Sequence, residues 1–265
     1  MNFPIRPILA EVEDIARLGF DYIEVAMDAP EGHYRKLLRH RKAIVSALHR
    51  YSMGVVCHLP TFVYTADLAE DIRRASLREM LRSLETAVDL GAEKAVLHPS
   101  IVSALGTLVL DQARSHADES LGVLVEEARR LNLTLCLENM FPGYHVGFEP
   151  VEFETWFAIY PDLKLTLDTG HGFIGGPGIR RILQFIGQFG SRLGHVHVSD
   201  NHGKRDDHLP VGSGRINFAA VASALLEAGY DGTITLEVFT EDRRALRRSR
   251  DRLASYLANV RSTDR

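Results

Sequence analysis

The stretch from Leu193 to Phe218 concentrates imidazole and carboxylate side chains at the point where a strand is predicted to end. Its first residues alternate in the manner of a β-strand, and Gly212 and Gly214 later turn the chain. His197 lies on the strand, and Asp206 and His208 follow it in a loop. Imidazole and carboxylate groups are ligands of Zn²⁺, Mn²⁺, Fe²⁺ and Co²⁺. The stretch therefore predicts part of a divalent-metal site.

Five further predicted strands also end in a ligand-type residue. These residues are His58 in VVCHLP, His98 in AVLHPS, Glu138 in LCLEN, Asp168 in TLDTGH and Glu237 in TLEVF, and His171 closely follows Asp168. Taken singly, each is more often a satisfied residue of the core or its rim. Several carboxylates in one partly dry site, however, repel one another unless a cation neutralises them. The joint pattern indicates a metal site that binds Zn, Mn, Fe or Co.

Eight predicted strands, alternating with eight predicted helices, must position these residues. The strands span residues 2–5, 22–27, 55–59, 94–98, 134–138, 164–168, 194–199 and 233–238. The helices span residues 11–18, 34–51, 69–90, 111–131, 151–160, 179–189, 218–228 and 242–260. This alternation is typical of an α/β protein with a single (β/α)₈ TIM barrel domain, here over residues 1–265. In that fold the strand ends meet on one face, so the candidate ligands should converge there.

Composition narrows the class of protein. With 45% hydrophobic and 25% charged residues in 265, the sequence is that of an ordinary globular protein, and its net charge of −4 gives no general attraction for polyanions. Cys57 and Cys136 lie in apolar segments, which indicates buried free thiols in a reducing compartment. We find neither an apolar run of the ~18 residues that a membrane span needs nor a signal-peptide pattern, so we expect a cytoplasmic protein without a membrane partner.

From about Tyr22 to Phe239 the motifs resemble those of xylose isomerase-like TIM barrels, which include sugar-phosphate isomerases, sugar epimerases and endonuclease IV. The most specific pieces are HLP at 58, LHP at 97, LEN at 137, LDTGH at 167, HVHVSDN at 195, HLPVGSGRI at 208 and LEV at 236. The resemblance to the epimerases implies one metal ion bound by Glu138, Asp168, His197 and Glu237. It also implies that Glu138 and Glu237 act as an acid–base pair.

The endonuclease-like branch implies a two- or three-metal site and phosphodiester hydrolysis of the apurinic/apyrimidinic endonuclease type. Its ligands would be His58, His98, Glu138, Asp168, His171, His197, Asp206, His208 and Glu237, which are all present. Duplex DNA, however, requires basic rim loops. Residues 26–33 contain two acidic residues and no Lys or Arg, and near the proposed site only Lys204, Arg205 and Arg215 are cationic. Three cations suit one phosphate or carboxylate better than a duplex.

The leading hypothesis is a divalent-metal-dependent isomerase or epimerase that acts on a small sugar, sugar phosphate or polyol ketone through proton abstraction and an enediolate. Glu138 and Glu237 would remove and return the proton, and His171 would hold a substrate oxygen or a second metal ion. The substrate would also contact Asn139, Lys204, Arg205 and Arg215. One to three metal ions per chain are expected. The hydrolase stays open as the alternative, and a barrel that binds metal or sugar without catalysis is a third possibility.

Overall fold

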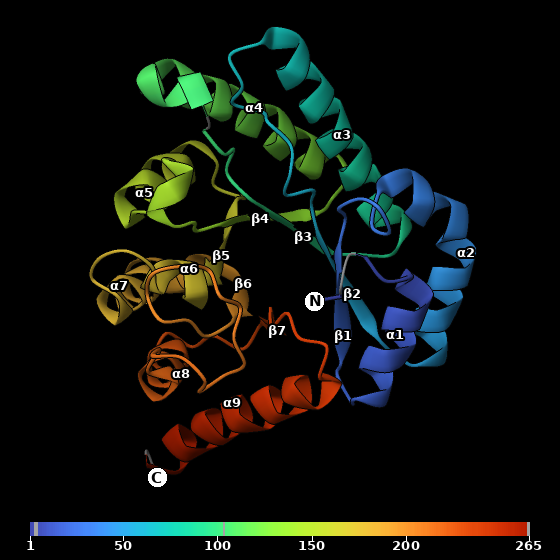
Figure 1. Cartoon of the computed structure of the whole chain (residues 1–265), viewed down its shortest axis with the longest axis vertical. Coiled ribbons are helices and arrows are strands. Elements are labelled where there is room, and N and C mark those ends of the chain that lie inside the picture. Colours follow the sequence, from blue (N-terminus) through green and yellow to red (C-terminus); the bar gives the residue numbers. More distant parts are fainter. Residues whose placement is uncertain (3–4, 103, 264–265) are drawn as a thin grey trace. The chain divides into compact units, whose positions relative to one another are not determined.

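The computed structural model describes residues 1–2, 5–102 and 104–263 (Figure 1). The chain divides into two compact units. The first comprises residues 1–137 and 144–146, and the second comprises residues 138–143 and 147–265.

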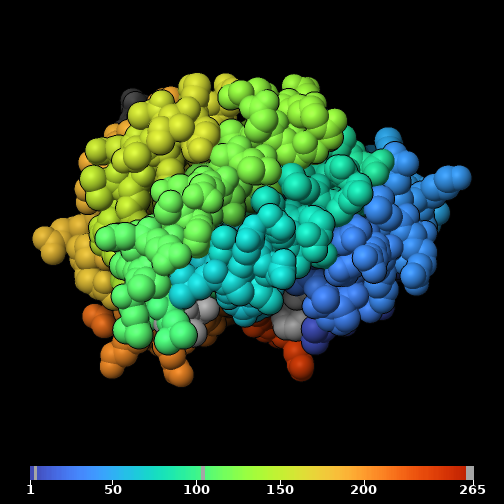
Figure 2. Space-filling view, turned by 90° about the horizontal axis from the view of Figure 1, so that it is seen from above, coloured from blue at the N-terminus to red at the C-terminus, as the bar shows by residue number. Residues whose placement is uncertain are grey.

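The first unit is built on strands β1 (Tyr22–Ala26), β2 (Gly54–His58), β3 (Lys94–Leu97) and β4 (Thr134–Glu138), which pair in parallel in sequence order. Its helices are α1 (Ile8–Arg17), α2 (Tyr34–Arg50), α3 (Glu70–Asp89) and α4 (Leu110–Arg130), with a 3₁₀ turn at Ala104–Leu108. Consecutive helices pack side by side. In Figure 2 the helices α2, α3 and α4 form much of the surface of this unit, in blue, cyan to teal, and green. Parallel strands need such crossover helices, which bury the apolar side chains of the strands.

The second unit repeats this arrangement with strands β5 (Lys164–Asp168), β6 (Leu193–Val198) and β7 (Thr233–Leu236), again parallel and in sequence order. Its helices are α5 (Pro150–Ile159), α6 (Thr169–Phe173), α7 (Ile179–Phe189), α8 (Phe218–Glu227) and α9 (Arg243–Thr263). A 3₁₀ turn at Gly190–Arg192 leads into β6, and another lies at Pro142–Tyr144. After β6 the chain forms a long loop, in which the backbone of Asp200 pairs with that of Leu209.

Glycines just after helices allow the chain to turn back into a strand. Gly91 follows α3 at φ +87°, and Gly229 follows α8 at φ +71°. This left-handed conformation is open to glycine at little steric cost, and it ends a helix by directing the chain away from the helix axis. Short helix-to-strand connections result.

The structure confirms most of the predicted elements. Among the described residues, seven strands match the seven predicted between residues 22 and 238, with ends shifted by two residues or fewer. The eight predicted helices are also present, with ends shifted by three residues or fewer. The predicted strand at residues 2–5 includes residues 3 and 4, which lie outside the described residues. Helix α6 was not predicted. Cys57 and Cys136 are buried free thiols, as expected.

No helix in the described part of the chain combines the length and the apolar character of a membrane span.

An aromatic cluster joins α5 to α7 in the core of the second unit. The ring of Phe153, which is fully buried, lies 5.1 Å from Trp156, 5.8 Å from Phe157, 5.3 Å from Phe185 and 6.4 Å from Phe189 between centroids. Edge-to-face and tilted pairs at such distances add to the stabilisation from burying apolar area.

Replacement of this central ring should destabilise the fold strongly. We expect Phe153→Ala to lower the free energy of unfolding by about 3–5 kcal/mol, because it removes buried contacts and leaves a cavity. Phe62, which is 79% exposed, supplies the matched control, and Phe62→Ala should change the free energy of unfolding by less than about 0.5 kcal/mol. Denaturant titration of the two variants tests this, and equal destabilisation would contradict the assigned core.

Candidate functional site

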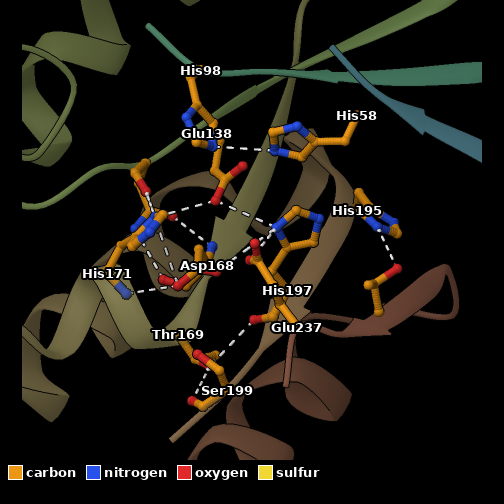
Figure 3. A network of polar contacts seen from close by, with 12 residues as sticks. His58, His98, Glu138, Asp168, Thr169, His171, His195, His197, Ser199 and Glu237 are labelled. Carbon is orange, nitrogen blue, oxygen red and sulfur yellow. Dashed lines mark hydrogen bonds and ion pairs between the residues drawn. The ribbon is translucent and has the colours of Figure 1, made fainter. Parts of the chain in front are cut away.

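Four ligand-type residues converge in the second unit, at the ends of β4, β5, β6 and β7 (Figure 3). This four-residue cluster consists of Glu138, Asp168, His197 and Glu237, and each offers one ligand atom within 4.8 Å of the others. The His197 Nδ1 atom lies 3.3 Å from Glu138 Oε1, 3.7 Å from Asp168 Oδ2 and 3.2 Å from Glu237 Oε2. All four side chains are buried. Three carboxylates therefore face one imidazole nitrogen.

Asn139 fixes the position of Asp168 relative to Glu138. Its side-chain Nδ2 donates to the backbone oxygen of Asp168 at 3.0 Å, and its Oδ1 accepts from the backbone nitrogen of Asp168 at 2.8 Å. Asn139 is fully buried. Because Asn139 directly follows Glu138, the two bonds couple the ends of β4 and β5. Asn139 therefore positions Asp168, and its contact with substrate stays a prediction.

Helix α6 places His171 beside the cluster. Asp168 is its N-cap, with Oδ1 accepting from the His171 backbone nitrogen at 2.6 Å. Gly170 is required for close packing, since a Cβ there would lie 2.5 Å from Ser199 Oγ. Thr169 Oγ1 donates to the backbone oxygen of His197 at 3.2 Å and so ties the helix to β6. This helix was not predicted from the sequence, although an Asp three residues before His171 is a capping signal.

A second group of ligand-type residues lies next to the first. This Asp206-centred group consists of His171, Asp206 and His208: Asp206 Oδ2 lies 3.1 Å from His171 Nε2 and 2.9 Å from His208 Nε2. His171 Nδ1 also lies 3.2 Å from Glu138 Oε1, and His208 Nδ1 lies 3.0 Å from the backbone oxygen of Glu237. Through His171 this group reaches the side chain of Glu138, and through His208 it reaches the backbone oxygen of Glu237.

The hydrogen-bond partners fix the protonation of two imidazoles. His171 faces the carboxylate of Asp206 and the backbone oxygen of Asn139, and His208 faces Asp206 and the backbone oxygen of Glu237. Carboxylate and carbonyl oxygens only accept, so both nitrogens of each ring must donate. Burial opposes this charge, but nearby carboxylates outweigh it and raise the pKa of His171 well above its ordinary value and that of His208 to about 9.

The pKa values of the buried carboxylates shift in different directions. Burial raises the pKa of Asp168 to about 8, opposed by His171 and reinforced by the charges of Glu138 and Glu237. Burial also acts to raise the pKa of Glu237, but its contact with His197 prevails and lowers it to about 2. Burial acts on Asp206 in the same direction, but hydrogen bonds from two histidines outweigh it and lower the pKa below its ordinary range. The neighbouring histidines therefore do not fully offset burial and the negative charges around Asp168.

The cluster fits a divalent cation. Asp168 Oδ2 and Glu237 Oε2 are buried and have no hydrogen-bond partner among the described residues, yet both face His197 Nδ1. A buried carboxylate oxygen without a partner is costly unless a cation neutralises it. Three carboxylates and one imidazole form a donor set suited to Zn²⁺, Mn²⁺, Fe²⁺ or Co²⁺. The four-residue cluster can hold such an ion.

His58 and His98, two further predicted ligands, lie together in the first unit. Their Nε2 atoms are 3.1 Å apart. The Nδ1 atom of His58 lies 2.9 Å from the backbone oxygen of Leu59, and that of His98 lies 3.3 Å from the hydroxyl of Tyr144. Each ring is thus held at Nδ1 and presents Nε2 to the other, which is an arrangement typical of a pair of metal-binding histidines.

The predicted cationic contacts remain at the surface. Lys204, Arg205 and Arg215 are exposed. Arg205 Nε lies 4.0 Å from Asp207 Oδ1, and within the described part of the chain no ion pair links the three cations to the four-residue cluster. Their role in binding substrate stays a prediction. His195, in contrast, is fully buried behind His197, with threonine hydroxyls at 2.6 Å and 3.1 Å from its two nitrogens.

Comparisons with known proteins place the chain in one family. A family model described as "xylose isomerase-like TIM barrel" matches residues 12–257. The chain is 24% identical over 244 residues to fructoselysine 3-epimerase from Shigella flexneri, which covers 88% of this chain and 86% of that protein.

Two solved structures are also similar. A D-tagatose 3-epimerase-like protein superposes with a TM-score of 0.86 at 26% identity over 100% of both chains. The TTHB071 protein from Thermus thermophilus, soaked with ZnCl₂, has a TM-score of 0.70 at 26% identity and covers 93% of this chain and 95% of that one. The full-length likeness to the first confirms the predicted α/β TIM barrel fold class.

Loss of one cluster carboxylate should weaken metal binding without unfolding the protein. We expect Asp168→Asn to raise the dissociation constant for Zn²⁺ by at least about 10-fold, the lower end of the effect of outer-sphere changes. The fold should persist because an asparagine oxygen still caps α6. Calorimetric titration with Zn²⁺ measures the constant, with the exposed Asp231→Asn as control. Equal affinity in Asp168→Asn and the wild type would remove Asp168 from the site.

Proposed function

We propose that this chain, which belongs to the xylose isomerase-like TIM barrel family, is a divalent-metal-dependent epimerase or isomerase of a small ketose, ketose phosphate or polyol ketone. The observation that carries the proposal is the pair of buried glutamates, Glu138 and Glu237, that approach His197 Nδ1 from different strands. The relatives add support, because they include a fructoselysine 3-epimerase and a D-tagatose 3-epimerase-like protein. The chain is a sugar isomerase/epimerase-like enzyme.

The proposed reaction inverts a stereocentre next to a carbonyl group, which is epimerisation, or moves the carbonyl group to the neighbouring carbon, which is isomerisation. One glutamate takes the proton from the carbon, and the other returns a proton to the opposite face. A cation held by Glu138, Asp168, His197 and Glu237 would supply positive charge to stabilise the substrate oxyanion. Despite burial, contact with His197 lowers the pKa of Glu237 to about 2 and makes it a weak base, so bound substrate would have to exclude water and raise the proton affinity of the glutamates.

His171 has a supporting role in this proposal. Its Nδ1 lies 3.0 Å from the backbone oxygen of Asn139 and 3.2 Å from Glu138 Oε1, and Asp206 Oδ2 lies 3.1 Å from its Nε2. The ring therefore orients one of the two acid–base carboxylates. At the surface, Lys204, Arg205 and Arg215 offer the positive charge that a phosphate or carboxylate on the substrate would require.

A metal-dependent phosphodiester hydrolase is the second candidate, and one observation favours it. The Asp206-centred group adds His171, Asp206 and His208 to the ligands beside the cluster, which is more than one ion requires. Two or three ions would supply the positive charge that in-line hydrolysis needs, in which a water oxygen bonds to phosphorus as the bond to the leaving alcohol oxygen breaks. Elemental analysis separates the candidates, since one ion per chain favours epimerisation and three favour hydrolysis. A net charge of −4 argues against duplex DNA as the substrate.

Replacement of either glutamate by glutamine, which cannot act as the proton-accepting base, should abolish turnover. We expect Glu138→Gln and Glu237→Gln each to lower kcat by at least about 10²-fold, since general acid–base catalysis contributes that much or more. The measurement follows deuterium incorporation from solvent into a panel of ketoses and ketose phosphates by proton NMR. Glu154→Gln, at an exposed position on α5, is the matched control and should retain wild-type turnover. Near-full activity in either cluster variant would show that the two-glutamate mechanism is wrong.

A further inference from the structure

We infer that Asp200 is a positioning residue, which holds the loop of residues 201–216 in place so that Asp206 and His208 orient the acid–base glutamates. The inference rests on the proposed function for its catalytic consequence. The loop of residues 201–216, called the strap below, lies within the second unit. It follows β6 and ends just before α8.

The carboxylate of Asp200 accepts hydrogen bonds from four backbone nitrogens. Oδ1 accepts from Asn201 at 2.9 Å and Ile216 at 3.1 Å, and Oδ2 accepts from Gly212 at 3.0 Å and Gly214 at 2.8 Å. Asp200 is fully buried. A single side chain thereby joins the beginning of the strap to its end.

These four bonds exclude a direct chemical role for Asp200. An ionised carboxylate has about four lone-pair sites, and here each oxygen already accepts twice. No acceptor site is left for a metal ion or for a substrate proton. Asp200 can affect the reaction only through the strap.

The close approach of the strap to Asp200 requires a glycine at position 214. A Cβ at this position would lie 2.4 Å from both Asp200 Oδ1 and the backbone oxygen of Asn201. Asn201 adds a second anchor, because its Nδ2 donates to the backbone oxygen of Gly170 in α6 at 2.8 Å. The strap is therefore fixed to the helix that carries His171.

The strap carries the two residues that reach the glutamates. Asp206 bonds His171, which contacts Glu138, and His208 Nδ1 lies 3.0 Å from the backbone oxygen of Glu237. His208 adopts φ +46°, a left-handed conformation that is unfavourable for a non-glycine residue and needs its surroundings to hold it. The backbone pairing of Asp200 with Leu209 holds the residue next to His208, and the carboxylate of Asp200 holds the end of the strap that follows it.

Asp200→Asn tests the inference with little change of shape. The new amide replaces one acceptor oxygen with a donor, so two of the four backbone nitrogens lose their partner. We expect kcat to fall by about 10²-fold, the cost of a misplacement on the order of 1 Å, with little change in KM. The amide hydrogens of Gly212 and Gly214 should exchange faster, and the imidazole ¹⁵N signals of His171 and His208 should shift.

Gly214→Ala supplies the second arm, and it also serves if the Asp200→Asn variant does not fold. It leaves the Asp200 carboxylate intact but pushes the strap away, so it should lower kcat and shift the same imidazole signals. Asp231→Asn, which makes the same change at an exposed site, should leave kcat and the signals unchanged.

The outcomes separate this inference from the proposed function. Wild-type imidazole signals and kcat in Asp200→Asn would overturn the positioning role, as would a loss of kcat in Asp200→Asn with no effect of Gly214→Ala. If the wild type turns over no ketose while both variants shift the signals of His171 and His208, the proposed function fails and the positioning role stands.

Discussion

The repulsion among three buried carboxylates is the constraint on which the rest of the site depends. Glu138, Asp168 and Glu237 all face the same nitrogen of His197, although buried like charges destabilise a fold. Protonated imidazoles offset part of this charge, and a bound cation would offset the remainder. Each group lies at or just after the end of a separate strand, and the hydrogen bonds of Asn139 to the backbone of Asp168 hold Asp168 in its position.

The sequence was sufficient to predict most of the fold and the members of the four-residue cluster. Repeated strand and helix periodicity located the elements to within a few residues, because each apolar strand is followed by a helix that covers it. The members of the cluster could be predicted because they are ligand-type residues at the C-terminal ends of largely apolar strands. Parallel strands end on the same side, so the position of Glu138 or Asp168 in its own strand already indicated that they would meet.

Contacts between backbone and side chain could not be predicted in the same way. Asn139 has the polarity of a substrate-binding residue, and only the structure shows that its amide is bonded to the backbone of Asp168. The short helix α6 was missed because five residues carry no periodic signal. The role of Asp200 was equally inaccessible, since it depends on the path of a loop that brings residues 212 to 216 back to its start.

The strap has two parts that differ in their contacts. Its ends are tied down at Asp200, whereas the side chains of Lys204 and Arg205 are exposed to solvent. Substitutions of Lys204 and Arg205 can therefore accumulate without disturbing the buried residues of the site. The positive charge of the strap can thus be altered at residues 204 and 205 without loss of the hydrogen bonds that hold its two ends.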